Sequence, residues 1–289
     1  MLLSPKIEEY WIKSPNYYSL QSLDKFLEYF FGGLDHEKIT GTIYDIQDLN
    51  TKSPGINVLL CVENCPQYKH YQHYNKYGNY SDSNIKIYLY NHIDKCVFTN
   101  KYIAIPIIYL QMTYFMKKYN IVKPLPIPVN CKKFCLITTS IRNQEKVNIV
   151  NTLQQIAPCN HIDIYKQYIG NKSCYHSQEL LDIFHQYKFV FVCENSIRDG
   201  YITEKIFNAF FSRTIPIYFG PSNIYRFFNK NSFVYIENPY DLTSVKNKIT
   251  MLNNNDTLYN TILNNKIVNT EFDDEDYIRK TNEFINLHH

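Results

Sequence analysis

The length, composition and charge of the chain suit a globular protein and argue against a nucleic-acid-binding or membrane-spanning protein. Its 289 residues, 45% hydrophobic and 20% charged, are enough for one large domain or two average ones with their own cores. The net charge is only +3 and the basic residues are scattered, which argues against a nucleic-acid-binding surface. The most apolar stretch, residues 102–116, is interrupted by Pro106 and Gln111 and is too short to span a membrane.

The first part of the chain shows a mixed α/β pattern. Residues 57–62 form a continuous apolar segment that predicts a buried strand, and residues 85–90 alternate as in a second strand. Helices are expected over residues 20–31 and around residues 107–119. The proline-rich segment 123–128 cannot continue a helix and predicts an extended connector at a domain boundary.

The second part alternates between strands and helices, which predicts a parallel sheet. Strands are expected over residues 133–138, 161–165, 188–193, 214–219 and 233–236. Helices are expected over residues 144–156, 177–187, 203–212, 242–252 and 273–287. We therefore predict an α/β fold with two domains, residues 1–125 and residues 126–289, the second of which includes the C-terminal helix.

The eight cysteines predict reduced and mostly buried thiols. Two pairs, Cys61 with Cys65 and Cys131 with Cys135, are separated by three residues, whereas a metal knuckle usually has two residues between its cysteines. Cys135 and Cys193 lie in apolar, strand-like runs. A zinc site or a disulfide framework is therefore the less favoured interpretation.

Residues 188–205 are the most informative segment of the chain. A buried-type strand over 188–193 runs into the polar sequence ENS at 194–196, and a loop containing Gly200 leads to a helix that begins near Thr203. In a doubly wound sheet, ligands bind beyond the carboxyl ends of the strands, and the amino end of the next helix favours anions. Lys205, a cation in the first helical turn, is disfavoured by the helix dipole unless an anionic ligand offsets the penalty. An ordinary strand-loop-helix with a solvated glutamate–lysine pair stays open on this reasoning alone.

The helix expected over residues 203–212 has two different faces. One face is apolar and is expected to pack in the core: Ile206, Phe207, Phe210 and Phe211. The opposite face is polar and is expected to look into a cleft or into water: Glu204, Lys205, Asn208 and Ser212.

Three sequence blocks in this region carry a resemblance to a known family. They are ENS at 194–196, YITEK at 201–205 and AFFSRTIPIYFGP at 209–221. Together they resemble the donor-site signature of the α1,3/4-fucosyltransferase family, glycosyltransferase family 10, and the similarity covers residues 188 to about 241. The resemblance implies the GT-B architecture, two Rossmann-like domains facing a cleft. It also implies that residues 126–289 bind the GDP-sugar donor and that residues 1–125 bind the acceptor.

The resemblance assigns roles on the donor side. It places Lys205 on a phosphate, Glu204 on the fucose or its developing positive charge, and Asn195 and Tyr201 on the donor ribose and phosphate. Arg142 follows the strand expected over 133–138 where a helix begins, so its guanidinium could hold phosphate oxygens bidentately. The resemblance also implies phosphate binding at Arg142, with an unspecific surface arginine as the alternative. Glu194 is expected to be structural, bonding loop amides at the strand end.

The catalytic base is expected in the first domain. Glu63 ends the strand predicted over residues 57–62, and strand-end glutamates are common without a function. The family has a Glu-Asn pair here and a second marker some forty residues later, which the segment from Tyr102 to Ile107 resembles. The resemblance therefore implies that Glu63 is the base. Residues 67–96, where the acceptor would bind, keep little of the family pattern.

No metal site is predicted. Metal-dependent sugar transferases commonly use an Asp-x-Asp motif, and Asp274-Glu275-Asp276 matches it literally. These residues open the final predicted helix, where carboxylates complement the helix dipole, so a structural role is favoured. We expect no cofactor to be required, and manganese stays open as a stimulant.

The sequence thus predicts an inverting, metal-independent glycosyltransferase that moves L-fucose from GDP-fucose to a sugar hydroxyl. The linkage implied by the resemblance is α1,3, to an N-acetylglucosamine or glucose residue of a glycan. Two alternatives are retained: the same fold with a different nucleotide sugar, and a non-catalytic glycan-binding relative. The N-terminal residues do not resemble a secretory signal, which suggests a soluble cytoplasmic protein or a catalytic region cut from a longer chain. The many Tyr, Phe, Asn, Ile and Lys residues have A/T-rich codons, which suggests a viral or bacterial source.

Overall fold

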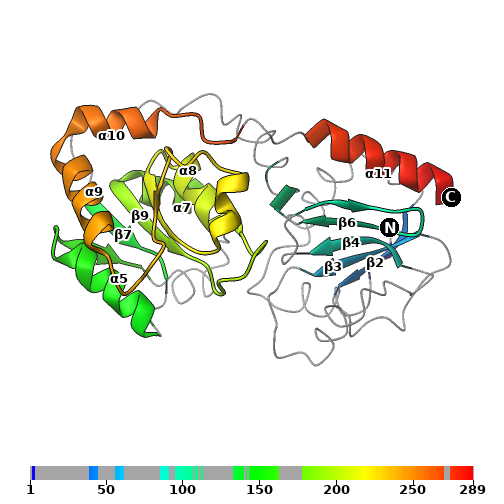
Figure 1. Ribbon diagram of the computed structural model, residues 1–289, viewed down its shortest axis with the longest axis horizontal. Helices are drawn as coiled ribbons and strands as arrows, with labels where there is room; N and C mark the ends of the chain where they lie inside the picture. Colours follow the sequence, from blue (N-terminus) through cyan, green and yellow to red (C-terminus); the bar gives the residue numbers. More distant parts are fainter. Residues whose placement is uncertain are drawn as a thin grey trace. The chain divides into compact units, whose positions relative to one another are not determined.

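The chain folds into two compact units (Figure 1). The computed structural model describes residues 2–3, 39–44, 56–61, 85–90, 95–106, 108–109, 112, 133–139, 141, 143–162, 178–269 and 274–288. The first unit comprises residues 1–114, 199–201 and 273–289, and the second comprises residues 115–198 and 202–272. The predicted connector at 123–128 and the helix predicted over 20–31 lie outside the described residues.

The first unit is built on a six-stranded sheet. Its strands, in spatial order, are β1 (Leu2–Leu3), β2 (Ile39–Tyr44), β3 (Ile56–Cys61), β4 (Ile85–Tyr90), β6 (Ile103–Pro106) and β5 (Val97–Phe98). All neighbours are parallel except β5 and β6, which are antiparallel. The strands predicted over 57–62 and 85–90 are confirmed, the first shifted by one residue.

The C-terminal helix α11 (Asp274–His288) groups with the first compact unit, whereas the sequence analysis placed it in the second domain. The Tyr277 hydroxyl donates to the Tyr109 carbonyl at 3.3 Å, and His288 Nε2 lies 2.8 Å from the Asn100 carbonyl. The Lys280 ammonium lies 5.5 Å from the ring centroid of Phe98. An amphipathic pattern shows that a helix has a buried face but does not show which core that face packs against. The prediction therefore assigned this helix to the domain that precedes it along the chain.

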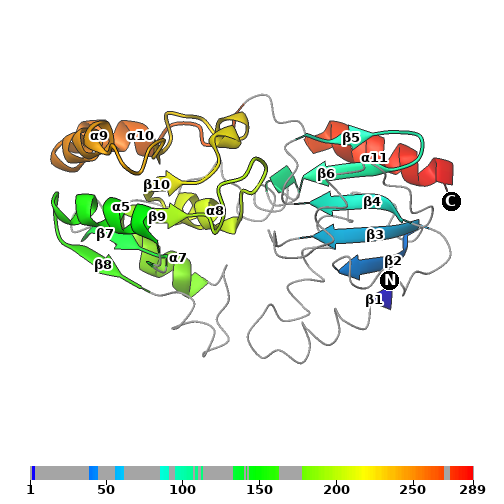
Figure 2. The ribbon, with the colours of Figure 1, turned by 60° about the horizontal axis from the view of Figure 1, so that its bottom comes forward.

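The second unit is a five-stranded parallel sheet with helices on both faces (Figures 1 and 2). Its strands are β7 (Lys133–Ile137), β8 (Cys159–His161), β9 (Tyr187–Cys193), β10 (Ile215–Phe219) and β11 (Val234–Tyr235). Its helices are α5 (Gln144–Gln154), α7 (Gln178–His185), α8 (Glu204–Phe211), α9 (Thr243–Asn254) and α10 (Asp256–Leu263), with a 3₁₀ turn η4 (Ser222–Arg226). The predicted alternation is confirmed.

Two elements of this unit were not predicted, and one strand is displaced. Helix α10 and the turn η4 fall in segments to which the sequence analysis assigned no element. Helix α10 begins because the Asn255 side chain accepts a hydrogen bond from the backbone N–H of Leu258 at 3.1 Å, which caps a new helix directly after α9. Strand β8 covers residues 159–161, whereas the prediction placed it over 161–165.

Strand alternation divides the core of the second unit into two layers. Buried side chains on one face of the sheet, including Phe189, Phe191 and Ile217, form one cluster with residues of α5, α9 and α10. The other face is covered by α7 and α8, as the views in Figures 1 and 2 show. Both layers are needed because every central strand is buried on both faces, as is usual for parallel sheets.

The strand order places a topological switch point in the second unit. The sheet order is β11-β10-β9-β7-β8, so the chain passes from β7 outward to β8 and then returns to the other side of β7 with β9. Ligands in such sheets bind at the carboxyl ends of the two strands where the direction reverses. That point lies between the ends of β7 and β9.

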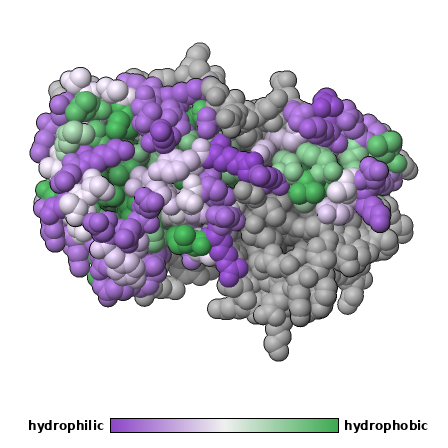
Figure 3. Space-filling model, viewed as in Figure 1, coloured by the Kyte–Doolittle hydropathy of each residue, from purple (hydrophilic) through white to green (hydrophobic). Residues whose placement is uncertain are grey.

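The surface shows no large apolar face in the part of the molecule that is described. Exposed large hydrophobic side chains are scattered among several elements, for example Ile197, Tyr240 and Met251. Hydrophobic and hydrophilic residues are interspersed over the second unit in the view of Figure 3. None of the described helices has the length and apolarity needed to cross a bilayer.

Candidate functional site

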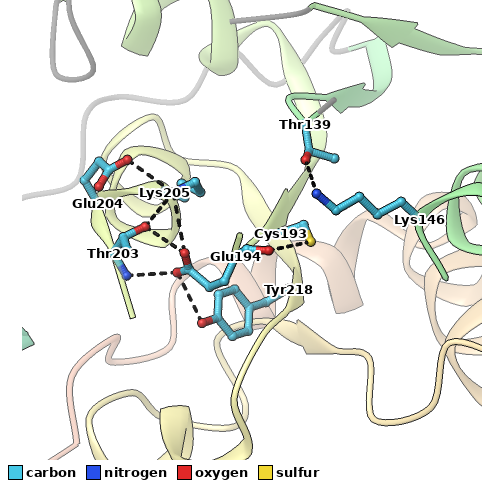
Figure 4. Close-up of polar contacts among 8 residues, drawn as sticks. All are labelled: Thr139, Lys146, Cys193, Glu194, Thr203, Glu204, Lys205 and Tyr218. Atoms are coloured by element: carbon cyan, nitrogen blue, oxygen red, sulfur yellow. Dashed lines mark hydrogen bonds and ion pairs between the residues drawn. The ribbon is translucent and has the colours of Figure 1, made fainter. Parts of the chain in front are cut away.

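A buried carboxylate organises the carboxyl end of β9. The Glu194 backbone N–H continues the sheet by donating to the Phe219 carbonyl at 2.9 Å, and the residue is 2% exposed. Its Oε1 accepts the backbone N–H of Thr203 at 2.9 Å, and its Oε2 accepts the Thr203 hydroxyl at 2.8 Å (Figure 4). Glu194 therefore fixes the loop that leads from β9 to α8, and its predicted structural role is confirmed.

Tyr218 on the neighbouring strand β10 completes the contacts of this carboxylate. Its hydroxyl donates to Glu194 Oε1 at 3.3 Å. The end of the Tyr218 ring lies so close to Gly220 that a Cβ at position 220 would overlap it. Glycine is therefore required at 220 for steric reasons, and a larger residue would displace the phenol that holds Glu194.

Lys205 is paired within the protein. Its Nζ lies 3.5 Å from Glu194 Oε2 and 3.5 Å from Glu204 Oε1, and it donates to the Thr203 hydroxyl at 2.8 Å (Figure 4). Two carboxylates thus offset the helix-dipole penalty at this position. The helix dipole therefore does not by itself require an anionic ligand at Lys205, because Glu194 turns toward this lysine. The sequence does not show that contact.

Burial controls the ionisation of the groups around Glu194. Burial raises the pKa of Glu194 above its ordinary value, while the nearby Lys205 ammonium and the Thr203 N–H act in the opposite direction. Burial also raises the pKa of Tyr218 well above its ordinary value, and the adjacent Glu194 carboxylate adds to the effect. Tyr218 therefore stays a neutral hydrogen-bond donor.

The polar face of α8 is mostly buried, which corrects the expectation that it looks into a cleft or into water. Asn208 is 4% exposed and Ser212 is fully buried. The Ser212 hydroxyl donates to the Asn208 carbonyl at 2.7 Å, and His185 Nδ1 lies 2.8 Å from the Ser212 carbonyl. Helix α7 covers this part of α8, so only the first turn, with Glu204 and Lys205, keeps partial exposure.

A second lysine, Lys146, lies at the same end of the sheet and was not predicted as a site residue. Lys146 lies in the first turn of α5, is 9% exposed, and donates from Nζ to the Thr139 hydroxyl at 3.0 Å (Figure 4). Thr139 follows β7, and Asn143 starts the helix by accepting the Lys146 backbone N–H at 3.0 Å. The signal that singled out Lys205, a cation in the first turn of a helix after a strand, also applied to Lys146.

The end of β9 lies between the two lysines. Cys193 faces the core layer that contains α5, whereas Glu194 bonds the first residues leading into α8. Burial raises the pKa of Cys193 to about 12, against the opposing influence of the nearby Lys146 ammonium. The Cys193 thiol is therefore neutral at physiological pH.

The other predicted site residues fall in different parts of the structure. Asn195 follows Glu194 directly and is exposed. Tyr201 is 2% exposed and groups with the first unit. Glu63 and Arg142 lie outside the described residues. The structure thus brings Glu204 and Lys205 together and leaves the roles of all six residues as proposals.

The Asp-x-Asp-like segment forms ion pairs within α11. Asp276 Oδ1 lies 2.7 Å from Arg279 Nη2, and Asp276 Oδ2 lies 2.6 Å from Lys280 Nζ. These pairs lower the pKa of Asp276, chiefly through the hydrogen bond from Lys280. Within the described ranges, no three His, Cys, Asp or Glu side chains gather as metal ligands.

The described cysteines agree with the prediction of reduced thiols. Four are free, with two of them buried and two partly buried: Cys135, Cys193, Cys96 and Cys159.

Comparison with known proteins identifies the family. The C-terminal model of glycosyltransferase family 10 (fucosyltransferase) matches residues 130–275, half of the chain. The chain belongs to this family. The matched segment contains the end of β9, α8 and both lysines.

Two relatives with fucosyltransferase names match part of this chain. The viral protein named "Putative fucosyltransferase R654", from Acanthamoeba polyphaga mimivirus, is 31% identical over 150 residues, 48% of this chain and 25% of its own length. The Alpha-(1,3)-fucosyltransferase FucT of Helicobacter pylori is 41% identical over 68 residues, 24% of this chain and 14% of its own length. The matches therefore span a quarter or less of these two relatives.

Solved structures of alpha1,3-fucosyltransferase have a similar fold. A crystal structure of alpha1,3-fucosyltransferase superposes with a TM-score of 0.62 over 95% of this chain and 90% of its own, at 17% identity. A form with GDP-fucose gives a TM-score of 0.54 over 84% of this chain and 77% of its own, at 18% identity. The predicted α/β fold of the GT-B class, with two Rossmann-like units, is confirmed.

Proposed function

We propose that the protein transfers L-fucose from GDP-fucose to a sugar hydroxyl, with inversion at the anomeric carbon and without a required metal. The proposed linkage is α1,3, to an N-acetylglucosamine or glucose residue of a glycan. The observation that carries the proposal is the family match over residues 130–275, which spans the whole strand-loop-helix segment at the end of β9. The names of two relatives that match part of this chain share fucose as the transferred sugar.

The proposed chemistry gives a role to each of the six predicted site residues. Glu63 takes the proton of the acceptor hydroxyl while its oxygen forms a bond to the anomeric carbon. The bond between that carbon and the GDP oxygen breaks, and the negative charge on GDP is stabilised by Arg142 and Lys205. Glu204 faces the positive charge that develops on the fucose, and Asn195 and Tyr201 bind the donor.

The buried Glu194 gives Lys205 a fixed position for this task. The ion pair at 3.5 Å and the shared Thr203 hydroxyl hold the ammonium at the amino end of α8 before any donor binds. A preorganised cation costs no reorganisation when charge develops on the leaving group. A donor phosphate would then share Lys205 with the partly exposed Glu204, whose side chain is 12% exposed.

The acceptor is the less constrained part of the proposal. GDP-fucose protein O-fucosyltransferase 3 of Xenopus laevis is 32% identical over 105 residues, 35% of this chain and 22% of its own length. Its name specifies the same donor but a protein acceptor. The acceptor panel in the test below therefore includes a protein hydroxyl beside the sugar hydroxyls.

A donor and acceptor panel tests the proposal. GDP release is measured from GDP-fucose, GDP-mannose and UDP-galactose, with lactose, N-acetyllactosamine and a folded protein domain as acceptors, in EDTA and in manganese. We expect turnover with GDP-fucose and a sugar acceptor that persists in EDTA. Turnover with a uridine donor only would overturn the donor assignment, and glycan binding without turnover on any donor would favour a non-catalytic protein.

Replacement of Lys205 tests the proposed role of the cation. In Lys205→Ala we expect a loss of roughly 2–4 kcal/mol of transition-state stabilisation, as for other preorganised groups. This loss corresponds to a decrease in kcat/KM of about 30- to 1,000-fold. Lys246→Met is the matched control, because Lys246 bonds only the Gln155 side chain on an exposed helix face. Full activity of Lys205→Ala at subsaturating GDP-fucose would contradict this mechanism.

A further inference from the structure

Lys146 is a buried lysine that forms no ion pair with any described carboxylate. Its residue is 9% exposed, and its Nζ donates to a neutral hydroxyl, that of Thr139, at 3.0 Å. No Asp or Glu pairs with it among the residues that the structure describes. Burying an unpaired charge is costly, so charged side chains that are buried are normally paired.

The groups around Lys146 do not supply the missing negative charge. Cys193 is neutral at physiological pH, because burial raises its pKa to about 12. Glu194, the next residue, directs its carboxylate to Thr203, Tyr218 and Lys205. Figure 4 shows Lys146 reaching Thr139 from one side of the end of β9 and the Glu194 group on the other side.

Lys146 also lies at the place in this sheet where ligands bind. Its hydroxyl partner Thr139 follows β7, and its neighbour Cys193 ends β9. These two strand ends enclose the topological switch point described above. Lys146 therefore lies buried at the switch point and not on a solvated helix face.

We infer that Lys146 binds a phosphate oxygen of the nucleoside diphosphate donor, as a second lysine of the donor site beside Lys205. The inference rests on the proposed function and adds a residue to it. Before the donor binds, the ammonium donates to the Thr139 hydroxyl and contacts the Cys193 thiol, and its remaining N–H donates to the ligand. The diphosphate supplies a negative charge that the described carboxylates do not supply.

The experiment compares ligands that differ only in their phosphates. Dissociation constants for GDP, GMP and guanosine are measured by calorimetry with the wild-type protein, Lys146→Met, Lys146→Arg and the control Lys246→Met. In Lys146→Met we expect GDP affinity to fall about 10- to 100-fold, as for a lost hydrogen bond to a charged group, with guanosine affinity changed less than about twofold. Lys146→Arg keeps the charge and should recover part of the GDP affinity. Lys246→Met should bind all three ligands as the wild type does.

Each other outcome is decisive. Unchanged GDP affinity in Lys146→Met would overturn the inference and leave the proposed function standing. An equal loss for GDP and guanosine would overturn it too, by showing that Lys146 only supports the fold. If the wild-type protein binds no guanine nucleotide, the proposed function fails and this inference fails with it.

A second variant covers the case in which Lys146→Met does not fold. Lys146→Gln is neutral but keeps a donor for the Thr139 hydroxyl, so the local packing is retained. The inference requires the same selective loss of GDP affinity in this variant. GDP binding by a folded Lys146→Gln protein at the wild-type level would contradict the inference.

Discussion

Two lysines in the first turns of α5 and α8, which cover opposite faces of the sheet, have different electrostatic surroundings. Lys205 in α8 has two carboxylates within 3.5 Å, whereas Lys146 in α5 has a hydroxyl and a neutral thiol nearby. The same sequence feature thus corresponds to a compensated cation in one helix and an uncompensated one in the other. The difference depends on Glu194, whose side chain turns toward α8.

The ionisation of Glu194 gives a prediction at the residue scale. Because its pKa in the folded state is raised above the ordinary value of 4.5, the unfolded chain ionises first as the pH rises. The stability that wild type has relative to Glu194→Gln should therefore be fully present below pH 4.5 and should be lost as the pH rises through the raised pKa. Urea unfolding of both proteins between pH 4 and pH 8 measures this difference. If the wild type instead becomes more stable relative to Glu194→Gln as the pH rises, the attraction of Lys205 has a larger effect on the Glu194 pKa than burial has.

At the scale of single elements, the two helices α5 and α10 begin in the same way. Each has an asparagine whose side chain accepts a backbone N–H three residues later, at 3.0 Å for Asn143 and 3.1 Å for Asn255. Such a cap satisfies one of the free N–H groups of the first turn. Only the helix capped by Asn143 carries a lysine at the switch point.

The two caps give a matched pair of variants. Asn143→Ala and Asn255→Ala should each lower the free energy of unfolding by about 1 kcal/mol, which urea unfolding measures. Only Asn143→Ala should also weaken GDP binding, because it loosens the turn that holds Lys146. Equal GDP affinity in the two variants would argue that the first turn of α5 takes no part in donor binding.

At the scale of the whole molecule, the C-terminal helix returns to the first unit. The buried face of α11 includes Tyr277, Phe284 and Ile285, and the ring of Tyr277 lies edge-on to that of Tyr109 at 5.4 Å. The first unit is therefore made of segments from both ends of the chain. Its stability depends on residues that lie beyond the last element of the second unit.

This arrangement predicts which unit loses stability when α11 is weakened. Ile285 is fully buried, so Ile285→Ala should cost about 2–5 kcal/mol. The loss should appear as faster hydrogen exchange in β4 and β6, with β9 and β10 unchanged. Leu287→Ala is the control, since Leu287 is 82% exposed and its replacement should change stability by less than about 0.5 kcal/mol. Faster exchange confined to β9 and β10 would place α11 with the second unit.

The sequence by itself determined the strand-helix alternation of the second unit, the family, and the segment at the end of β9 that carries Glu204 and Lys205. These follow from short-range patterns, because hydrophobic periodicity and contiguous motifs are written along the chain. It also indicated that Glu194 bonds the loop that follows it.

Only the tertiary structure decided which unit α11 joins, that Asn208 and Ser212 are buried, and that Glu194 pairs with Lys205. It also decided that Lys146 bonds a hydroxyl at the switch point and pairs with no carboxylate in the described part of the chain. Each of these depends on which side chains meet after the sheet has formed. Burial and charge compensation are set by residues distant in sequence, so a local pattern does not contain them.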